Sequence, residues 1–216
     1  MRSFFFHSPL SRAARQLQAD AAQLGRDVDR EAVTTALHAI YDEESLAEQL
    51  AAWAQPAVQR MVRTRVLARL AGVESDWRLR APDVLAQVNR CVGGAEPAVI
   101  GQVTPDGTLA HAGRTYTVQH ITLQHRALAG PIRWRCSGLP GLMDAVNHVL
   151  GEAGEAGRFA GLATDGDYYA YVYGRPDAMA QLARAGAVAL SGERDPVSGP
   201  LPAGGGPPRA EGAVRE

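Results

Sequence analysis

The stretch RTYTVQHITL, from Arg114 to Leu123, decides the fold class. It is rich in threonine, tyrosine, valine and isoleucine, which are the residues that favour β-strands. The stretch IRWRC that follows at Ile132–Cys136 alternates apolar residues with arginines, as a strand with one buried face does. The sequence therefore predicts a sheet here, with Arg133 and Arg135 on its polar face beside Thr115, Thr117 and Gln119 of the neighbouring strand.

Two hairpins and two helices surround these strands in the predicted sheet region. The first hairpin turns at Thr104-Pro105-Asp106-Gly107, because Pro-Asp-Gly suits a type I turn, and the second turns at Asp165-Gly166. Apolar stripes with helical spacing predict one helix from about Leu139 to Gly151 and another that opens at Pro176.

The part of the chain before about Val92 has a helical period instead. Ser8, Asp29 and Asp42 are suitable N-cap residues, and Pro56 and Pro82 suit the first turn of a helix. A seam of apolar residues spaced by three and four consists of Leu10, Ala14, Leu17, Ala21, Leu24 and Val28. The seam could pack within the chain, which its short length favours, or across a homodimer.

These patterns predict an α+β protein in three parts. Residues 1–93 form a helical N-terminal domain, and residues 94–190 form an α+β domain with a small mixed or antiparallel sheet and two helices. Residues 191–216 are rich in glycine and proline with little apolar content, and this composition predicts a disordered C-terminal tail.

All 22 basic residues are arginine, and the formal net charge is −1. The lack of lysine excludes Schiff-base and Walker A chemistry, and an arginine-, alanine- and glycine-rich composition indicates a GC-rich bacterial genome. The two cysteines are too few for a disulfide framework, and no stretch is apolar enough for a signal peptide or a membrane span. We therefore expect a cytoplasmic protein with no membrane partner.

Positive charge gathers locally, because no acidic residue lies between Asp106 and Asp144. An arginine-rich sheet face would contact phosphates through its guanidinium groups, while aromatic rings would stack on bases. The sequence thus predicts a nucleic-acid-binding protein, regulatory or related to DNA repair, whose site residues are Arg114, Arg126, Arg133, Arg135, Tyr116 and Trp134. The simpler interpretation is a solvated sheet face whose arginines pair with carboxylates elsewhere.

Three alternatives remain open from the sequence. A winged helix would use Pro82–Val92 as its recognition helix, with Gln87, Asn89 and Arg90 as readers and the first hairpin as the wing. A protein-interaction module would use the apolar seam for a homodimer. An enzyme with an arginine-lined pocket for an anionic substrate is the third alternative.

The sequence predicts no catalytic residue, cofactor or metal site. Cys136 near His120, His125 or His148 is the one nucleophile and base combination, but Cys136 shares its strand face with apolar residues and is expected to be buried. The histidines match no zinc motif, and Asp165-Gly166-Asp167 lacks the glutamate that closes a calcium loop. A protein without enzymatic activity is therefore favoured.

Overall fold

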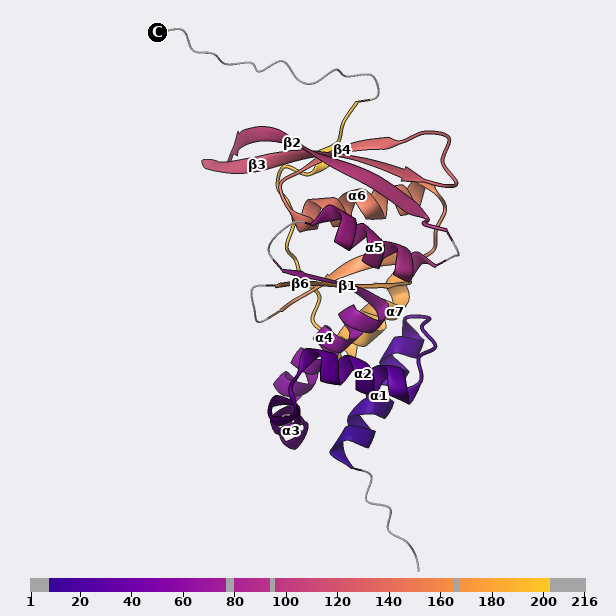
Figure 1. Cartoon of the computed structure of the whole chain (residues 1–216). Helices are drawn as coiled ribbons and strands as arrows, with labels where there is room; N and C mark the ends of the chain where they lie inside the picture. The colour runs from indigo at the N-terminus through magenta and orange to yellow at the C-terminus, as the bar shows by residue number, and fades with distance from the viewer. Residues whose placement is uncertain (1–7, 77–79, 94–95, 165–167, 203–216) are drawn as a thin grey trace, which may run out of the picture.

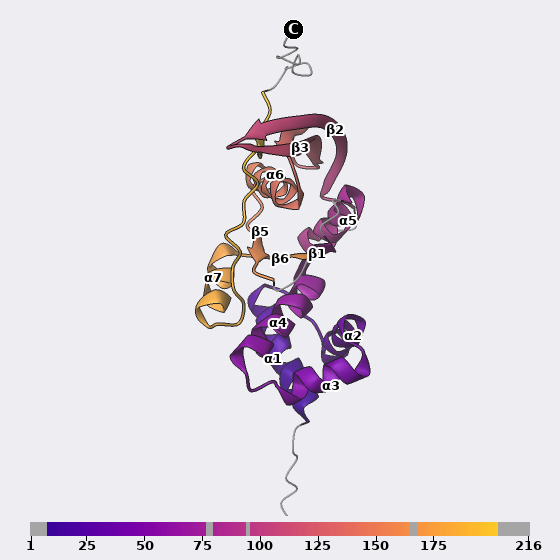
Figure 2. The same cartoon turned by 90° about the vertical axis from the view of Figure 1, so that its left-hand side faces the viewer.

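The computed structural model describes residues 8–76, 80–93, 96–164 and 168–202. It stacks four layers: a helical bundle, a three-stranded sheet, a pair of helices and a four-stranded sheet (Figures 1 and 2). Both sheets are antiparallel. The predicted α+β class is confirmed, although two sheets replace the single sheet that we expected.

The helical bundle begins with the helices that the sequence predicts. They are α1 (Pro9–Gln23), α2 (Arg30–Ile40), α3 (Glu43–Ala51) and α4 (Pro56–Ala71). Ser8, Asp29 and Asp42 each accept a hydrogen bond from a backbone N–H in the first turn, so their predicted capping roles are confirmed.

The apolar seam of α1 is used inside the chain. Ala14, Leu17 and Ala21 are fully buried, and α1 packs against α2, α4 and α7 (Pro176–Arg184). The intramolecular packing of the seam is therefore confirmed. The same side chains already fill the core of the monomer, and a homodimer remains a prediction.

The first sheet contains strands from both predicted domains, which the sequence pattern divides at Gly93. It has the strand order β1 (Gly72–Asp76), β6 (Tyr168–Gly174), β5 (Arg158–Leu162). The sequence pattern does not predict β1, which follows α4 without a loop. A Cβ at Gly72 would overlap the backbone of Tyr171, so only glycine allows β1 to lie this close to β6. The division into domains remains a prediction, but the folded chain shares a sheet across it.

The third layer consists of α5 (Ala81–Val92) and α6 (Leu139–Glu152), which lie between the two sheets. The side-chain amide of Gln87 bonds the backbone N–H and C=O of Glu74 at 3.0 and 3.1 Å. Asn89 does the same to Val99, at 2.8 and 2.7 Å. The winged-helix interpretation is wrong, because these two amides bind the edge strands of the sheets and α5 is not a free recognition helix.

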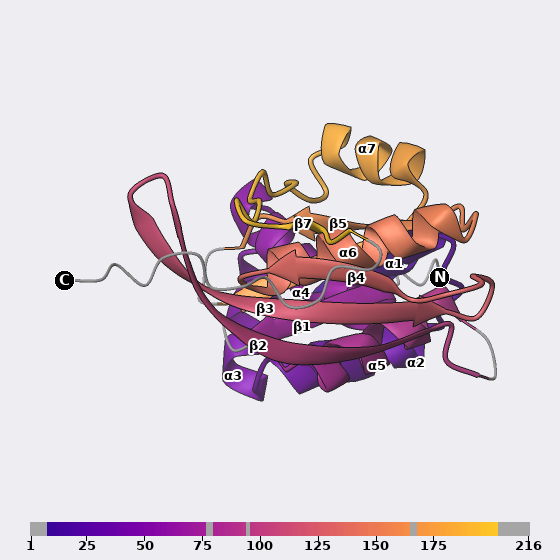
Figure 3. The same ribbon diagram turned by 90° about the horizontal axis from the view of Figure 1, so that it is seen from above.

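The second sheet has the strand order β2 (Val99–His111), β3 (Arg114–His125), β4 (Ile132–Cys136), β7 (Gly199–Pro200), and Figure 3 shows it from above. The predicted turn at Thr104–Gly107 is wrong, because β2 runs through it with a bulge between Pro105 and Gly107. The chain turns instead at Ala112 and Gly113, whose φ angles of 49° and 76° suit a two-residue hairpin turn.

Part of the predicted tail belongs to the fold. The N–H of Ser191 donates to the carbonyl of Gly161, and Gly199 pairs with Arg135 through β7. Asp195 is buried and accepts hydrogen bonds from the Ser137 hydroxyl at 2.9 Å and from the Val197 N–H at 3.1 Å. Residues 191–202 are therefore anchored along both sheets, and the rest of the predicted tail lies outside the described residues.

Candidate nucleic-acid interface

One face of the second sheet is covered by α5 and α6, whereas no described element covers the other face (Figures 1 and 2). Alternation along the strands points Ile121, Leu123 and Cys136 inward, where they are fully buried. We define the open face by its outward residues, which are Ile100, Gln102, Thr104, His120, Thr122, Gln124, Arg133 and Arg135. Ile100 is 57% exposed, so this face meets solvent at its β2 edge. Val118 has the same strand parity as His120 but is 2% exposed, so the face is not open along the whole of β3.

The two arginines of β4 lie on the open face, as the strand pattern predicts. Arg133 is paired across the sheet with Thr122, and Arg135 is paired with His120. Both arginines are half-buried. The Nε of Arg135 donates to the carbonyl of Val197 at 3.4 Å, which ties its guanidinium group to the C-terminal segment.

A bulge brings one carboxylate to this face. Gln119 is paired with Pro105 and Val118 with Gly107, so Asp106 is the extra residue of β2. Its Oδ2 lies 2.7 Å from Nε2 of His120. Asp106 is the only acidic residue in the four strands of this sheet, all of which lie within the described chain. The open face therefore carries more positive than negative charge.

Tyr116 and Arg114 have the same strand parity as His120 but lie nearer the hairpin turn. Tyr116 is half-buried, and its ring makes an edge contact with His111 at a centroid distance of 6.5 Å. Arg126 is exposed beyond the other end of β3. At a strand rise of 3.3 Å per residue, Arg114 and Arg126 are at most about 40 Å apart. The structure therefore brings Arg133 and Arg135 together but places Arg114 and Arg126 at opposite ends.

Trp134 is not on the open face, contrary to its predicted stacking role. Its side chain points inward and is 8% exposed, and its ring lies 5.1 Å from that of His148. Its indole N–H donates to the hydroxyl of Ser198 at 2.7 Å. Because the ring faces and the polar atom are all engaged, Trp134 cannot stack on a base.

Sequence reasoning also chose the wrong neighbours for the arginines. Thr115, Thr117 and Gln119 were expected beside them, but Gln119 is paired with the inward Cys136. His120 and Thr122 hold those positions instead. Alternation along β3 was visible in the sequence, but the register between β3 and β4 was not, and a shift of one residue exchanges the two faces.

The cysteines offer no activated nucleophile. Cys136 is fully buried, and burial together with the nearby Asp195 raises its pKa to about 12. Burial also raises the pKa of Cys91, whose thiol donates to the carbonyl of Gly72 at 3.2 Å. Both thiols therefore stay protonated at neutral pH and are poor nucleophiles.

Within the described ranges, no three histidine, cysteine, aspartate or glutamate side chains come together as metal ligands would. The Asp165-Gly166-Asp167 stretch lies outside those ranges. Among the described helices, none combines the length and the apolar character needed to cross a membrane.

Comparisons with protein-family models, with curated proteins and with solved structures each found no match for this chain.

Proposed function

We propose that the open face binds single-stranded nucleic acid, with Arg133 and Arg135 contacting the phosphates. The observation that carries this proposal is the pair of arginines beside His120 and Thr122, on a sheet face that holds one carboxylate. Guanidinium forks bind phosphate oxygens well, and threonine hydroxyls add neutral hydrogen bonds. Binding without catalysis suits a role in regulation or DNA repair in the bacterial cytoplasm.

A single strand fits this surface better than a duplex does. The open face belongs to a sheet, and none of the described helices protrudes from it to enter a major groove. Sheet faces bind single strands by following the backbone with cations and by stacking bases on aromatic rings. Tyr116 is an aromatic residue of β3, and the alternation along the strand places it on the same side as His120.

The chain as a whole does not attract a polyanion, because its net charge is −1. Binding must therefore come from the arginines of the open face. The affinity should fall steeply as the salt concentration rises, because each phosphate contact releases a counterion. Each phosphate contact on a single strand contributes about 0.7 to the slope of log K against log salt concentration.

The test is fluorescence anisotropy of labelled oligonucleotides of single-stranded DNA, single-stranded RNA and duplex DNA, each at two salt concentrations. We expect the full chain to bind the single strands, and we expect Arg133→Ala with Arg135→Ala to weaken that binding at least tenfold at low salt. The salt slope should fall by about 1.4 when two contacts are lost. The comparison of DNA with RNA also defines the type of nucleic acid.

The matched control is Arg12→Ala with Arg184→Ala, which removes the same charge from exposed positions on α1 and α7. This control should bind as the unmodified chain does. Equal affinity of the open-face variant and the unmodified chain would overturn the proposal, as would a failure of the unmodified chain to bind any single strand at low salt.

A further inference from the structure

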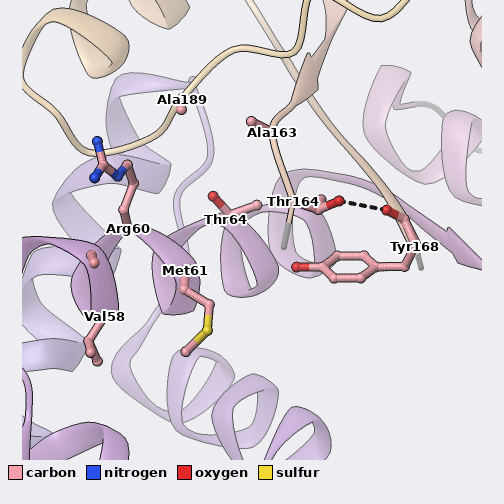
Figure 4. A pocket seen from close by; sticks show the side chains of 9 residues that line it. Val58, Arg60, Met61, Thr64, Ala163, Thr164, Tyr168 and Ala189 are labelled. Carbon is pink, nitrogen blue, oxygen red and sulfur yellow. Dashed lines mark hydrogen bonds between the residues drawn. The ribbon is translucent and has the colours of Figure 1, made fainter. Parts of the chain in front are cut away.

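A cavity of about 360 Å³ lies between α4, the residues that directly follow β5, Tyr168 at the start of β6, and Ala189 (Figure 4). Its volume is within the range of about 300–1,000 Å³ that is typical of small-molecule sites. Val58, Met61 and Thr64 line it from one side of α4, because residues three and four apart share a helix face. Ala163 and Ala189 line it from the opposite side.

The wall opposite α4 is held in place by interactions within the chain. The N–H of Ala163 donates to the carbonyl of Ala189 at 2.8 Å, and the Thr164 hydroxyl donates to the carbonyl of Tyr168 at 2.8 Å (Figure 4). The guanidinium carbon of Arg65 lies 5.2 Å from the centre of the Tyr168 ring. The cavity is therefore formed before a ligand arrives, which lowers the entropy lost on binding.

The lining is mostly apolar, with one cation at its edge. Alanine, valine and methionine side chains make up most of the wall, and Figure 4 shows the guanidinium group of Arg60 at the rim on the side of Ala189. Arg60 is exposed and forms no ion pair with any described residue. An apolar body would fill the cavity, and an anionic end group would pair with Arg60.

We propose that this cavity binds a small amphipathic acid, which has an apolar chain and one carboxylate. The chain lies against Met61 and Val58, and the carboxylate pairs with Arg60. This site is separate from the nucleic-acid interface, since the α5 and α6 layer lies between them (Figure 1).

The test is isothermal titration calorimetry of the full chain with decanoate and with decan-1-ol, which differ in the charged end group. We expect decanoate to bind more tightly than the alcohol. Arg60→Gln should weaken decanoate binding about threefold to fivefold and leave decan-1-ol binding unchanged, because an exposed ion pair contributes up to about 1 kcal/mol. Ala189→Phe should abolish binding of both compounds by filling the cavity.

Arg184→Gln is the matched control, since it removes an exposed arginine from α7 and should bind both compounds as the unmodified chain does. Thermal melting shows whether each variant is folded. Equal decanoate affinity of Arg60→Gln and the unmodified chain would overturn the proposal. Absence of decanoate binding at millimolar concentration would overturn it as well.

Discussion

The carboxylate of Asp106 lies 2.7 Å from the imidazole of His120 on the open face of the second sheet. A bulge in β2 makes this contact possible, because Asp106 has no cross-strand partner of its own. The contact places the only acidic side chain of the sheet beside the cross-strand partner of Arg135. Asp106 therefore reduces the positive charge of the surface that we propose to bind phosphates.

Asp106→Asn should strengthen the binding of single-stranded DNA. The substitution removes one negative charge and keeps a side chain of nearly the same size beside His120. A partly exposed unit charge contributes up to about 1 kcal/mol, so we expect an affinity gain of roughly threefold to fivefold at low salt. Anisotropy titrations measure it, with Asp177→Asn on the exposed end of α7 as the control. This prediction depends on the proposed function, and it fails if the chain binds DNA but Asp106→Asn binds no more tightly.

The buried ion pair of Asp20 and Arg63 should stabilise the packing of α1 against α4. Their side chains form two hydrogen bonds of 2.7 and 2.8 Å, and the residues are only 4% and 8% exposed. Asp20→Ala leaves a buried guanidinium group without its counterion, so we expect a loss of about 3–5 kcal/mol in the free energy of unfolding. Urea denaturation measures this loss.

The exposed pair of Arg175 and Asp177 provides the comparison, at an N–O distance of 3.2 Å. Asp177→Ala should change the free energy of unfolding by less than about 1 kcal/mol, because solvent screens the pair. Similar losses for Asp20→Ala and Asp177→Ala would show that burial does not strengthen the first pair.

Asp195 should hold the C-terminal segment against the start of α6. It accepts hydrogen bonds from the N–H and hydroxyl of Ser137 and from the N–H of Val197. A Cβ at Gly141 would collide with its carboxylate, which shows how closely α6 approaches. Asp195→Ala leaves these donors without a partner, so we expect about 2–4 kcal/mol of destabilisation.

Hydrogen exchange locates this effect, since Asp195→Ala should raise the exchange of residues 191–202 and of the first turn of α6. Glu193→Ala is the control, because Glu193 is an exposed carboxylate two residues away. Unchanged exchange in residues 191–202 of Asp195→Ala would mean that β7 and the contact with β5 hold the segment without Asp195.

Stability should decline at alkaline pH because of Cys136. Burial raises its pKa to about 12 in the folded chain, whereas an unfolded thiol has a pKa of about 8.5. The contribution of the protonated thiol is complete below about pH 8.5 and is lost as pH rises toward 12. Between these values the free energy of unfolding should fall by about 1.4 kcal/mol per pH unit for this one proton.

Urea denaturation between pH 8 and pH 10.5 tests this linkage by comparing Cys136→Ala with the unmodified chain. The variant should show a shallower slope of stability against pH. Cys91→Ala should reduce the slope less, because Arg26 and Arg90 oppose the effect of burial on the Cys91 thiol. Parallel slopes for Cys136→Ala and the unmodified chain would contradict the prediction.

The sequence by itself determined the local structure of this protein. Helix caps such as Ser8 and the alternation of Arg133, Trp134 and Arg135 depend on neighbours along the chain, and the structure confirms both. The acid-free stretch likewise contains β3 and β4, which carry the two arginines of the open face. These properties follow from backbone geometry and residue type, which short segments already contain.

Only the tertiary structure decided which distant residues meet. Nothing in the sequence pairs β1 with β6, places Arg63 beside Asp20, or brings Asp195 to Ser137, because each contact joins segments at least 43 residues apart. The bulge at Asp106 and the register of β3 against β4 are also products of sheet packing. They decide that His120 and Thr122 accompany the arginines, whereas Trp134 is buried on the opposite face.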